Sequence, residues 1–417
     1  MRPVRAAAII AVGSELLTPD RTDTNSLWLT ARLNELGIDV RMKIVAGDST
    51  DDLSAAFTLA LAHADLVVTT GGLGPTADDL TRETVAAVLG RDLEPNGSVL
   101  EAIRERFRRR GLPMPAANAR QASVPAGAVV LPNHAGTAPG LWLEAGDRVC
   151  VLLPGPPREL QPMFEAHVAP RLQERVGVQR LRRRVIGVTG LTESRTEEIA
   201  QPVYSTFATE AIPLATTILA SPGRIELHLS AAGSDATALD GALDQGVQRL
   251  AAALGDAVFS TDGRTLEQVV AAILEARKLR LAVAESCTGG LVLGRLTNVP
   301  GSSGWLIGGV VAYDNAVKIE ALGVPPALIE EQGAVSEEVA RAMAEGVRRR
   351  FGADIGLSVT GVAGPSGGTP AKPVGTVAIA LDGPSPRART FAFGGDRAMV
   401  RALSVAAALD MVRRSLG

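Results

Sequence analysis

Apolar runs alternate with helical repeats along the first half of the chain. Residues 5–12 are almost continuously apolar, as expected of a strand that is covered on both faces. Residues 24–36 place apolar side chains at helical spacing before Gly37, a common helix stop. The same reasoning predicts further strands at 38–45, 65–70 and 149–153 and a helix at 50–64. This alternation predicts a parallel sheet wound by helices on both faces.

The pattern changes at residues 170–184, where basic and polar residues are frequent. Beyond this stretch the sequence predicts a smaller α+β unit, with strands at 185–188 and 224–231 and a helix at 193–200. An α/β pattern then resumes. It predicts helices at 265–276 and 397–415 and strands at 279–284, 305–312, 354–358 and 374–381. The fold class is therefore α/β, with a doubly wound domain at 1–170, a small α+β connecting domain at 171–255 and an α/β domain at 256–417.

Composition narrows the class of protein. A chain of 417 residues exceeds what one hydrophobic core usually organises. With 46% hydrophobic residues, 21% charged residues and a net charge of -3, the chain produces no strong electrostatic field that would attract nucleic acid or a membrane surface. The two cysteines, Cys150 and Cys287, exclude a disulfide framework, which predicts a reducing, cytoplasmic location. The first apolar stretch is interrupted at Gly13, which favours a buried strand over an export signal.

Ser286 and Cys287 stand side by side where the predicted strand 279–284 ends, just before Thr288 and Gly289. Backbone N–H groups at a helix start lack partners within the helix and can hold an anion or a developing oxyanion. A nucleophile at this position would therefore have electrophilic assistance beside it. The alternative is that Ser286 and Thr288 only cap the following helix.

A nucleophilic serine needs a base, and no histidine follows His228 in the chain. This excludes a Ser-His-Asp triad within the C-terminal domain. Tyr313 and Lys318 are the local candidates, because burial can lower the pKa of a lysine enough for it to accept a proton. Taken singly, Lys318 can equally be a solvated helix residue.

Two further features of this region suggest an anionic ligand. A glycine-rich loop runs from Gly361 to Gly368 and includes Gly364, and such a loop can bring backbone amides close to a phosphate or simply make a tight turn. Arg397, in the segment GGDR, can form a bidentate pair with phosphate or cap the last helix.

A second glycine-rich turn follows the predicted strand 65–70. It contains Gly71, Gly72 and Gly74, and Asp78 and Asp79 open the next predicted helix. In a wound parallel sheet, ligands bind at the carboxyl ends of the strands, where glycines let phosphate oxygens reach N–H groups. The two aspartates can hold a divalent ion that bridges a pyrophosphate, or only stabilise the helix start.

The motifs of both regions resemble one known family. AESCTGG, YDNAVK, GAVSEEVA, TGVAGPSGG, KPVGTV and GGDR, in this order, resemble the C-terminal domain of the CinA family. VGSELL, GGLGPTADDLT, NHAGTAPG and LPGPPREL resemble its N-terminal domain, which shares the molybdopterin-binding MoaB/MogA fold. Members of this type are nicotinamide-nucleotide amidohydrolases, which convert nicotinamide mononucleotide and water to nicotinate mononucleotide and ammonia in pyridine-nucleotide salvage. Their N-terminal domain is associated with ADP-ribose pyrophosphatase activity that depends on a divalent metal ion and potassium.

The resemblance implies roles for individual residues. Ser286 would be the nucleophile, with Lys318 and Tyr313 moving its proton. Beyond what the resemblance implies, we expect the amides of Thr288 and Gly289 to stabilise the oxyanion, and we expect Arg397, Gly361 and Gly364 to bind the 5′-phosphate. The amidohydrolase would need no metal or organic cofactor. In the N-terminal domain the substrate would meet Gly71, Gly72, Gly74 and Thr76, with Asp78 and Asp79 as metal ligands. The family pattern also implies a homodimer.

A non-enzymatic reading of the chain stays open. A competence or DNA-repair partner could use the same glycine loops only to bind nucleotides. Arginine clusters at 108–110, 182–184 and 348–350 suggest DNA, but aromatic residues make up only 3% of the chain. These clusters are therefore interpreted as solvated helix faces, and nucleic acid is not an expected partner.

Overall fold

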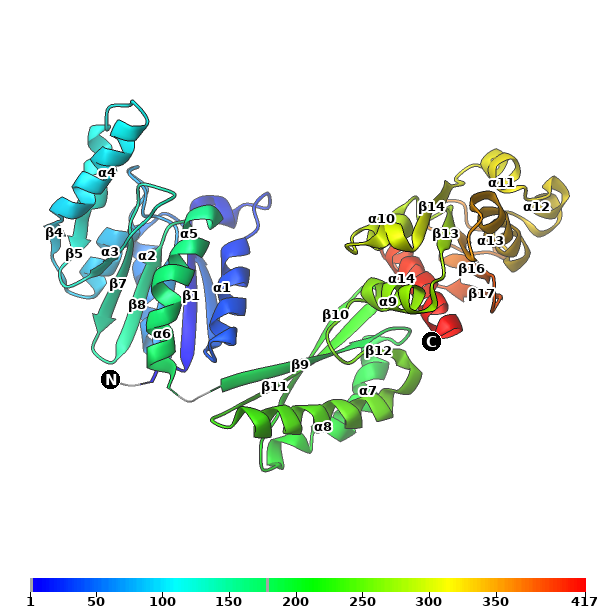
Figure 1. Cartoon of the computed structure of the whole chain (residues 1–417), viewed down its shortest axis with the longest axis horizontal. Helices are drawn as coiled ribbons and strands as arrows, with labels where there is room; N and C mark the ends of the chain where they lie inside the picture. The colour runs from blue at the N-terminus through cyan, green and yellow to red at the C-terminus, as the bar shows by residue number, and fades with distance from the viewer. Residues whose placement is uncertain (1–2, 178–179) are drawn as a thin grey trace. The chain divides into compact units, whose positions relative to one another are not determined.

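The computed structural model describes residues 3–177 and 180–417 (Figure 1). The chain divides into two compact units, Met1–Arg182 with Ala232–Leu239, and Arg183–Ala231 with Asp240–Gly417. The division into three domains at 170 and 255 stays a prediction. Helix α6 carries the N-terminal core past residue 170, since Leu172 and Val176 are buried in it.

The N-terminal unit alternates strands and helices in the predicted order. Its strands are β1 (Ala6–Val12), β2 (Asp39–Ala46), β3 (Leu66–Thr70), β4 (Leu93–Pro95), β5 (Ser123–Pro125), β6 (Val129–Leu131), β7 (Gly140–Ala145) and β8 (Arg148–Leu153). Its α-helices are α1 (Thr24–Glu35), α2 (Thr50–His63), α3 (Thr81–Val88), α4 (Gly97–Arg109), α5 (Pro157–Met163) and α6 (Ala169–Val176).

The main sheet of this unit has the order β2-β1-β3-β8-β7-β6. Strands β2, β1, β3 and β8 are parallel, and β7 and β6 add an antiparallel edge. Alternate residues of β1 enter different cores: Ala7 and Ile9 pack with α1, α5 and α6, whereas Ala8 and Ile10 pack with α2 and α3 (Figure 1). The prediction of a doubly wound sheet is confirmed.

The connecting segment is built around a small sheet of order β10-β11-β9-β12. Its elements are β9 (Arg180–Val188), α7 (Glu193–Tyr204), β10 (Ala215–Ser221), β11 (Arg224–Gly233), α8 (Ala236–Leu254) and β12 (Val258–Ser260). The stretch 170–184, interpreted from its polarity as a boundary, is helix α6 and the start of β9 over most of its length, and residues 178–179 lie outside the described part.

The C-terminal part has a five-stranded sheet of order β14-β13-β15-β16-β17. Its strands are β13 (Leu281–Glu285), β14 (Leu306–Val311), β15 (Ile355–Gly361), β16 (Thr376–Asp382) and β17 (Arg387–Ala392). Its helices are α9 (Leu266–Arg277), α10 (Leu291–Thr297), α11 (Asn315–Leu322), α12 (Pro326–Gln332), α13 (Glu337–Phe351) and α14 (Arg397–Leu416). The predicted α/β class is confirmed here as well.

Helices cover both faces of this sheet, and β14, β13 and β15 run parallel. Val283 and Leu357 face a core shared with α9, α10 and α14, whereas Ala282 and Ala284 face α11 and α13. Strands β16 and β17 complete the sheet as an antiparallel pair. The carboxyl ends of β13, β14 and β15 therefore meet at one edge of the sheet.

None of the helices in the described part of the chain is long and apolar enough to cross a membrane.

We expect Gly346 to control how closely α11 approaches α13. A Cβ at Gly346 would lie 1.9 Å from the carbonyl oxygen of Leu322, the last residue of α11. Gly346→Ala should therefore lower the free energy of unfolding by about 1–3 kcal/mol. Gly294→Ala is the matched control, because Gly294 is also helical and a Cβ there meets nothing within 4 Å. Chemical denaturation of both variants checks this, and equal stability would show that α11 shifts without cost.

Candidate functional sites

The predicted catalytic residues lie at the carboxyl edge of the C-terminal sheet. Ser286 directly follows β13, and its N–H donates to the carbonyl oxygen of Val359 in β15 at 2.9 Å. Tyr313 follows β14, the neighbour of β13 on the other side. Because these strands are parallel neighbours, their loops converge at a topological switch point, where open α/β sheets bind ligands.

A buried carboxylate fixes the turn that carries Ser286. Glu285 has no exposed surface, and its carboxylate accepts the N–H groups of Gly290 at 2.9 Å, Val292 at 3.1 Å and Leu293 at 2.9 Å. Helix α10 thus begins at Leu291, later than the sequence suggested, and its start is already neutralised by Glu285. The interpretation of Ser286 and Thr288 as helix caps is wrong.

The Ser286 hydroxyl is available for chemistry. The residue is only 8% exposed, and no group in the described part of the chain hydrogen-bonds its Oγ. The turn itself uses the N–H of Gly289, which donates to the carbonyl oxygen of Ser286 at 3.1 Å. The choice of Gly289 as an oxyanion donor is therefore not supported, and the turn requires glycine there because φ is +60°.

Lys318 is buried, with 2% of its surface exposed, so the alternative of a solvated helix residue is wrong. Its Nζ lies 3.4 Å from the carbonyl oxygen of Tyr313 and 3.3 Å from Oδ1 of Asn315. Desolvation lowers the pKa of Lys318 below its usual 10.5, against opposing contributions from Asp314 and Cys287. A neutral amine, able to accept a proton, is thus available at lower pH than in a free lysine.

Cys287 is less suited to be the nucleophile than its neighbour. Its side chain is 5% exposed and packs in the hydrophobic core beneath the turn. Burial, helped by the nearby Glu285, raises the pKa of the thiol to about 11. The thiolate, which is the reactive form of cysteine, is therefore scarce near neutral pH.

Arg397 joins two other residues that the sequence singled out. Its Nη1 donates to the carbonyl oxygen of Gly364 at 2.8 Å, and its Nη2 donates to the hydroxyl of Tyr313 at 2.9 Å. Asp396, not Arg397, caps the last helix, because its carboxylate accepts the N–H of Met399. The cap alternative for Arg397 is wrong. Tyr313 is 61% exposed, so this group lies at the mouth of the site.

The glycine loop after β15 presents unused N–H groups. In residues 3–177 and 180–417, no acceptor takes the N–H of Gly364, Ser366 or Gly367. Gly361 has a different role: it lies within β15, where a Cβ would meet Cγ2 of Val377 at 2.7 Å. The loop beyond it, more than Gly361 itself, is the part that can hold an anion.

Sequence reasoning missed two contributors to this site, Glu285 and Arg401. Arg401 donates through Nη2 to the carbonyl oxygen of Thr288 at 2.8 Å, and its Nε is buried without a partner among the described residues. The hydroxyl of Thr288 is also buried and unpartnered in that part of the chain. The available signals were a glutamate that ends an apolar strand and an arginine four residues after Arg397, one helical turn further along the same face.

The N-terminal glycine turn lies at the carboxyl end of β3, between β1 and β8. The N–H of Gly71 donates to the carbonyl oxygen of Leu153 at 3.0 Å, and a Cβ at Gly71 would lie 2.3 Å from the carbonyl oxygen of Val12. The hydroxyl of Thr81 occupies the space beside Gly72 and donates to the Gly71 carbonyl at 2.9 Å. The three strand ends are thus drawn together at the switch point of this sheet.

The two candidate metal ligands stand in different surroundings. The carboxylate of Asp79 stabilises the loop, because its Oδ2 accepts hydrogen bonds from the N–H of Thr76 at 2.9 Å and from the Thr76 hydroxyl. This carboxylate lies beside Gly74. Asp78 is exposed, and the neighbouring Thr76 side chain, its own backbone N–H and the charge of Arg120 lower the pKa of its carboxyl. Helix α3 begins only at Thr81, so the prediction that the aspartates open it is wrong.

A metal ion would need ligands beyond these two carboxylates. Among the residues that the structure describes, no three His, Cys, Asp or Glu side chains form a metal-binding group. Arg120 contacts the carbonyl oxygen of Thr76 at 2.5 Å and Glu83 at 3.0 Å, so this guanidinium lies against the same loop. The arrangement fits an ion held by one or two carboxylates together with substrate phosphates, the usual mode for Mg²⁺.

The arginine-rich segments contain ion pairs. The pairs are Arg109 with Glu105, Arg184 with Asp244, and Arg348 with Asp382. These partners neutralise part of each cluster, which disfavours a nucleic-acid surface. The interpretation as helix faces holds for 108–110 at the end of α4 and for 348–350 in α13, but it is wrong for 182–184, which lie in strand β9.

Comparison with known proteins gives consistent matches over the whole chain. Residues 263–416 match the family described as the CinA C-terminal domain, and residues 8–174 match the probable molybdopterin binding domain. A CinA-like protein of Koribacter versatilis is 45% identical over 98% of this chain and 99% of its own length. A putative competence-damage inducible protein of Desulforudis audaxviator is 45% identical over 90% of each chain. A solved structure of CinA from Thermoplasma acidophilum, 33% identical, covers 40% of this chain and 98% of its own, with a TM-score of 0.38.

Glu285→Gln should loosen the turn that carries Ser286. The amide keeps one acceptor oxygen but turns N–H groups toward the helix start, so charge-assisted bonds to Gly290, Val292 and Leu293 are lost. We expect the free energy of unfolding to fall by on the order of 2 kcal/mol. Glu330→Gln, on the exposed side of α12, is the control and should leave stability unchanged. Thermal and urea denaturation measure both, and a wild-type value for Glu285→Gln would refute this role.

Proposed function

The chain belongs to the CinA family, and on that premise we propose that its C-terminal domain hydrolyses the carboxamide of nicotinamide mononucleotide to nicotinate mononucleotide and ammonia. The observation that carries the proposal is a nearly buried serine with a free hydroxyl, Ser286, in the same strand-edge site as a buried lysine of lowered pKa, Lys318. A nucleophile and a base are both needed for amide hydrolysis, and this pair supplies them without histidine.

In the proposed reaction, Oγ of Ser286 attacks the carboxamide carbon while its proton passes to the neutral amine of Lys318. The C–N bond then breaks, the proton moves to the departing nitrogen, and ammonia leaves an ester of nicotinate on Ser286. Water attacks this ester, Lys318 accepts its proton and returns it to Oγ, and nicotinate mononucleotide is released. We assign assistance in these transfers to the hydroxyl of Tyr313, and a hydrogen bond from Arg397 at 2.9 Å supports this role.

Two parts of the site support recognition of this substrate. The N–H and the unpartnered hydroxyl of Thr288 are the proposed donors to the oxyanion, because both belong to the turn that holds Ser286. The guanidinium of Arg397 and the free N–H groups of Gly364, Ser366 and Gly367 are the proposed 5′-phosphate site. This reaction requires no metal ion or organic cofactor.

Replacing the nucleophile tests the proposal directly. Ser286→Ala should reduce ammonia release from nicotinamide mononucleotide by at least about a thousandfold, because catalytic residues act together and removing the nucleophile abolishes most of their joint effect. Cys287→Ala, one residue away and equally buried, is the matched control and should keep most of the activity. A coupled ammonia assay measures both, with circular dichroism to verify folding. Retained turnover in Ser286→Ala, or its loss in Cys287→Ala alone, would assign the reaction to the thiol.

For the N-terminal domain we propose cleavage of the pyrophosphate of ADP-ribose at the loop from Gly71 to Asp79. The support is the position of this loop at the switch point of a doubly wound sheet. Neighbouring atoms lie so close to Gly71, Gly72 and Gly74 that a Cβ would not fit at these positions. Asp78 and Asp79 would hold a divalent ion together with the pyrophosphate oxygens, and the ion would neutralise charge on the phosphates. Potassium is proposed as the second ion.

Replacing the two aspartates separates metal binding from loop structure. Asp78→Asn removes an exposed charge and should lower metal-stimulated cleavage of ADP-ribose by at least about tenfold. Asp79→Ala also frees Thr76 and should lower both activity and loop order. Asp51→Asn, on an exposed turn of α2 in the same domain, is the control. Release of AMP with and without Mg²⁺ is the readout, and unchanged metal stimulation in Asp78→Asn and Asp79→Ala would refute this proposal.

A protein inactive on both substrates would instead fit the non-enzymatic alternative, a nucleotide-binding partner. The homodimer and the cytoplasmic location stay predictions of the sequence.

A further inference from the structure

A second cavity lies in the C-terminal unit, apart from the amidase residues. It has a volume of about 1230 Å³ and is lined by α14, by β17 and by the turns at 189–193 and 220–225. Ser286, Lys318, Tyr313 and Arg397 are not among its lining residues. The proposed amidase reaction therefore makes no use of it.

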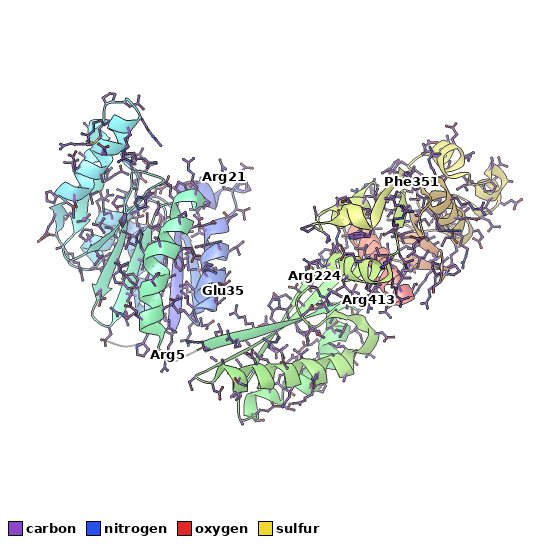
Figure 2. The ribbon with its side chains drawn as sticks, in the orientation of Figure 1. Arg5, Arg21, Glu35, Arg224, Phe351 and Arg413 are labelled. Carbon is purple, nitrogen blue, oxygen red and sulfur yellow. The ribbon has the colours of Figure 1, made fainter. Side chains whose placement is uncertain are left out.

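Close contacts between the connecting segment and α14 form the walls of the cavity. A Cβ at Gly223, in the turn between β10 and β11, would lie 2.4 Å from Cβ of Ala406 in α14. The hydroxyl of Thr189 donates to the carbonyl oxygen of Gly223 at 2.9 Å. Arg413, labelled in Figure 2, donates from α14 to the carbonyl oxygen of Asp256 at 2.7 Å. The cavity is thus bordered by elements that are fixed to one another.

Positive charge predominates in the lining. Five arginines line the cavity against two acidic residues: Arg224, Arg341, Arg387, Arg389 and Arg414, with Glu193 and Asp410. Asp410 is already paired with Arg413 at 2.8 Å and Arg414 at 2.7 Å. Arg387 has no ion-pair or hydrogen-bond partner among the described residues. Guanidinium groups of this kind bind phosphate through two parallel hydrogen bonds.

Planar groups form a row beside these charges. The guanidinium carbon of Arg389 lies 4.9 Å from the ring centroid of Phe391. The rings of Phe391 and Phe393 stack with centroids 5.4 Å apart and planes inclined by 13°. The facing side of α14 is apolar, with Met399, Leu403, Ala406, Ala407 and Met411. Flat arginine and aromatic groups next to phosphate-binding charge are the pattern with which proteins bind nucleobases.

The cavity is less suited to an extended peptide, even though β17 is the edge strand of its sheet. The carboxylate of Glu337 accepts the N–H of Thr390 at 2.8 Å and its hydroxyl at 3.2 Å. Glu337 thereby covers the middle of the strand edge to which an added strand would pair.

We propose that this cavity binds a nucleoside diphosphate. Its phosphates pair with Arg387 and Arg389, and its base lies against the row formed by Arg389, Phe391 and Phe393. The volume exceeds the range of ordinary small-molecule pockets, which leaves room for both phosphates and the base. The cavity would give the chain a nucleotide site separate from the two proposed reaction sites.

Fluorescence titration of the full chain with N-methylanthraniloyl-ADP tests this site. The double variant Arg387→Glu/Arg389→Glu should weaken the affinity at least tenfold, because it reverses both phosphate-binding charges. Arg349→Glu reverses an exposed charge on α13, outside the cavity, and should leave the affinity unchanged. Deamidation of nicotinamide mononucleotide by the double variant, measured in parallel, should be unchanged because the cavity is separate from Ser286.

Hydrogen exchange separates this cavity from the N-terminal loop, which is itself a proposed nucleotide site. With ADP bound, protection should appear at residues 220–225 and 387–394 in the wild type and disappear in the double variant. Arg387→Lys/Arg389→Lys keeps the charge but loses the planar groups, and should bind with intermediate affinity. Protection confined to residues 71–83, or equal affinity of wild type and Arg387→Glu/Arg389→Glu, would overturn the proposal.

Discussion

The buried carboxylate of Glu285 is the interaction on which the C-terminal site depends. Burying a charged group costs free energy unless the group is hydrogen-bonded, and three backbone N–H groups at the start of α10 meet that need. In return, the carboxylate satisfies donors that the helix cannot satisfy itself. Glu285 thereby fixes the turn between β13 and α10, and no side chain within the turn is needed for this. Ser286 is held in place while its hydroxyl remains free.

Helix α14 connects this turn to the rest of the site. Arg397 and Arg401 stand four residues apart on this helix. Arg397 contacts the loops of Tyr313 and Gly364, and Arg401 contacts the turn at Thr288. At its other end, Arg413 holds the carbonyl oxygens of Asp256 and Val258 in the connecting segment. One rigid helix thus borders both the proposed amidase site and the second cavity.

The two proposed reaction sites share a design although their sheets differ. In each, a strand of a parallel set ends in a glycine turn at the switch point, and an acidic side chain ties that turn internally. Glu285 does this through helix N–H groups, whereas Asp79 does it through Thr76. The difference matters for function: Glu285 is sealed from solvent, while the N-terminal loop keeps Asp78 exposed, where it can meet a metal–phosphate complex.

The sequence by itself determined the order of the elements and the candidate residues. Continuous apolar runs such as β1 and β13 can only be strands or helices covered on both faces, and short runs beside glycines favour strands. Ser286, Tyr313 and the loop containing Gly364 each follow such a strand, so their meeting at one sheet edge follows from a parallel arrangement.

Only the tertiary structure decided how those residues act. Lys318 is buried in α11, and α11 packs closely on α13 at Gly346, neither of which a local pattern records. The start of α10 was misplaced because its cap comes from Glu285, a strand residue that acts up to eight positions ahead. The bond between Tyr313 and Arg397 spans 84 residues. Local propensity carries no information about such contacts, since they exist only once the separate elements pack together.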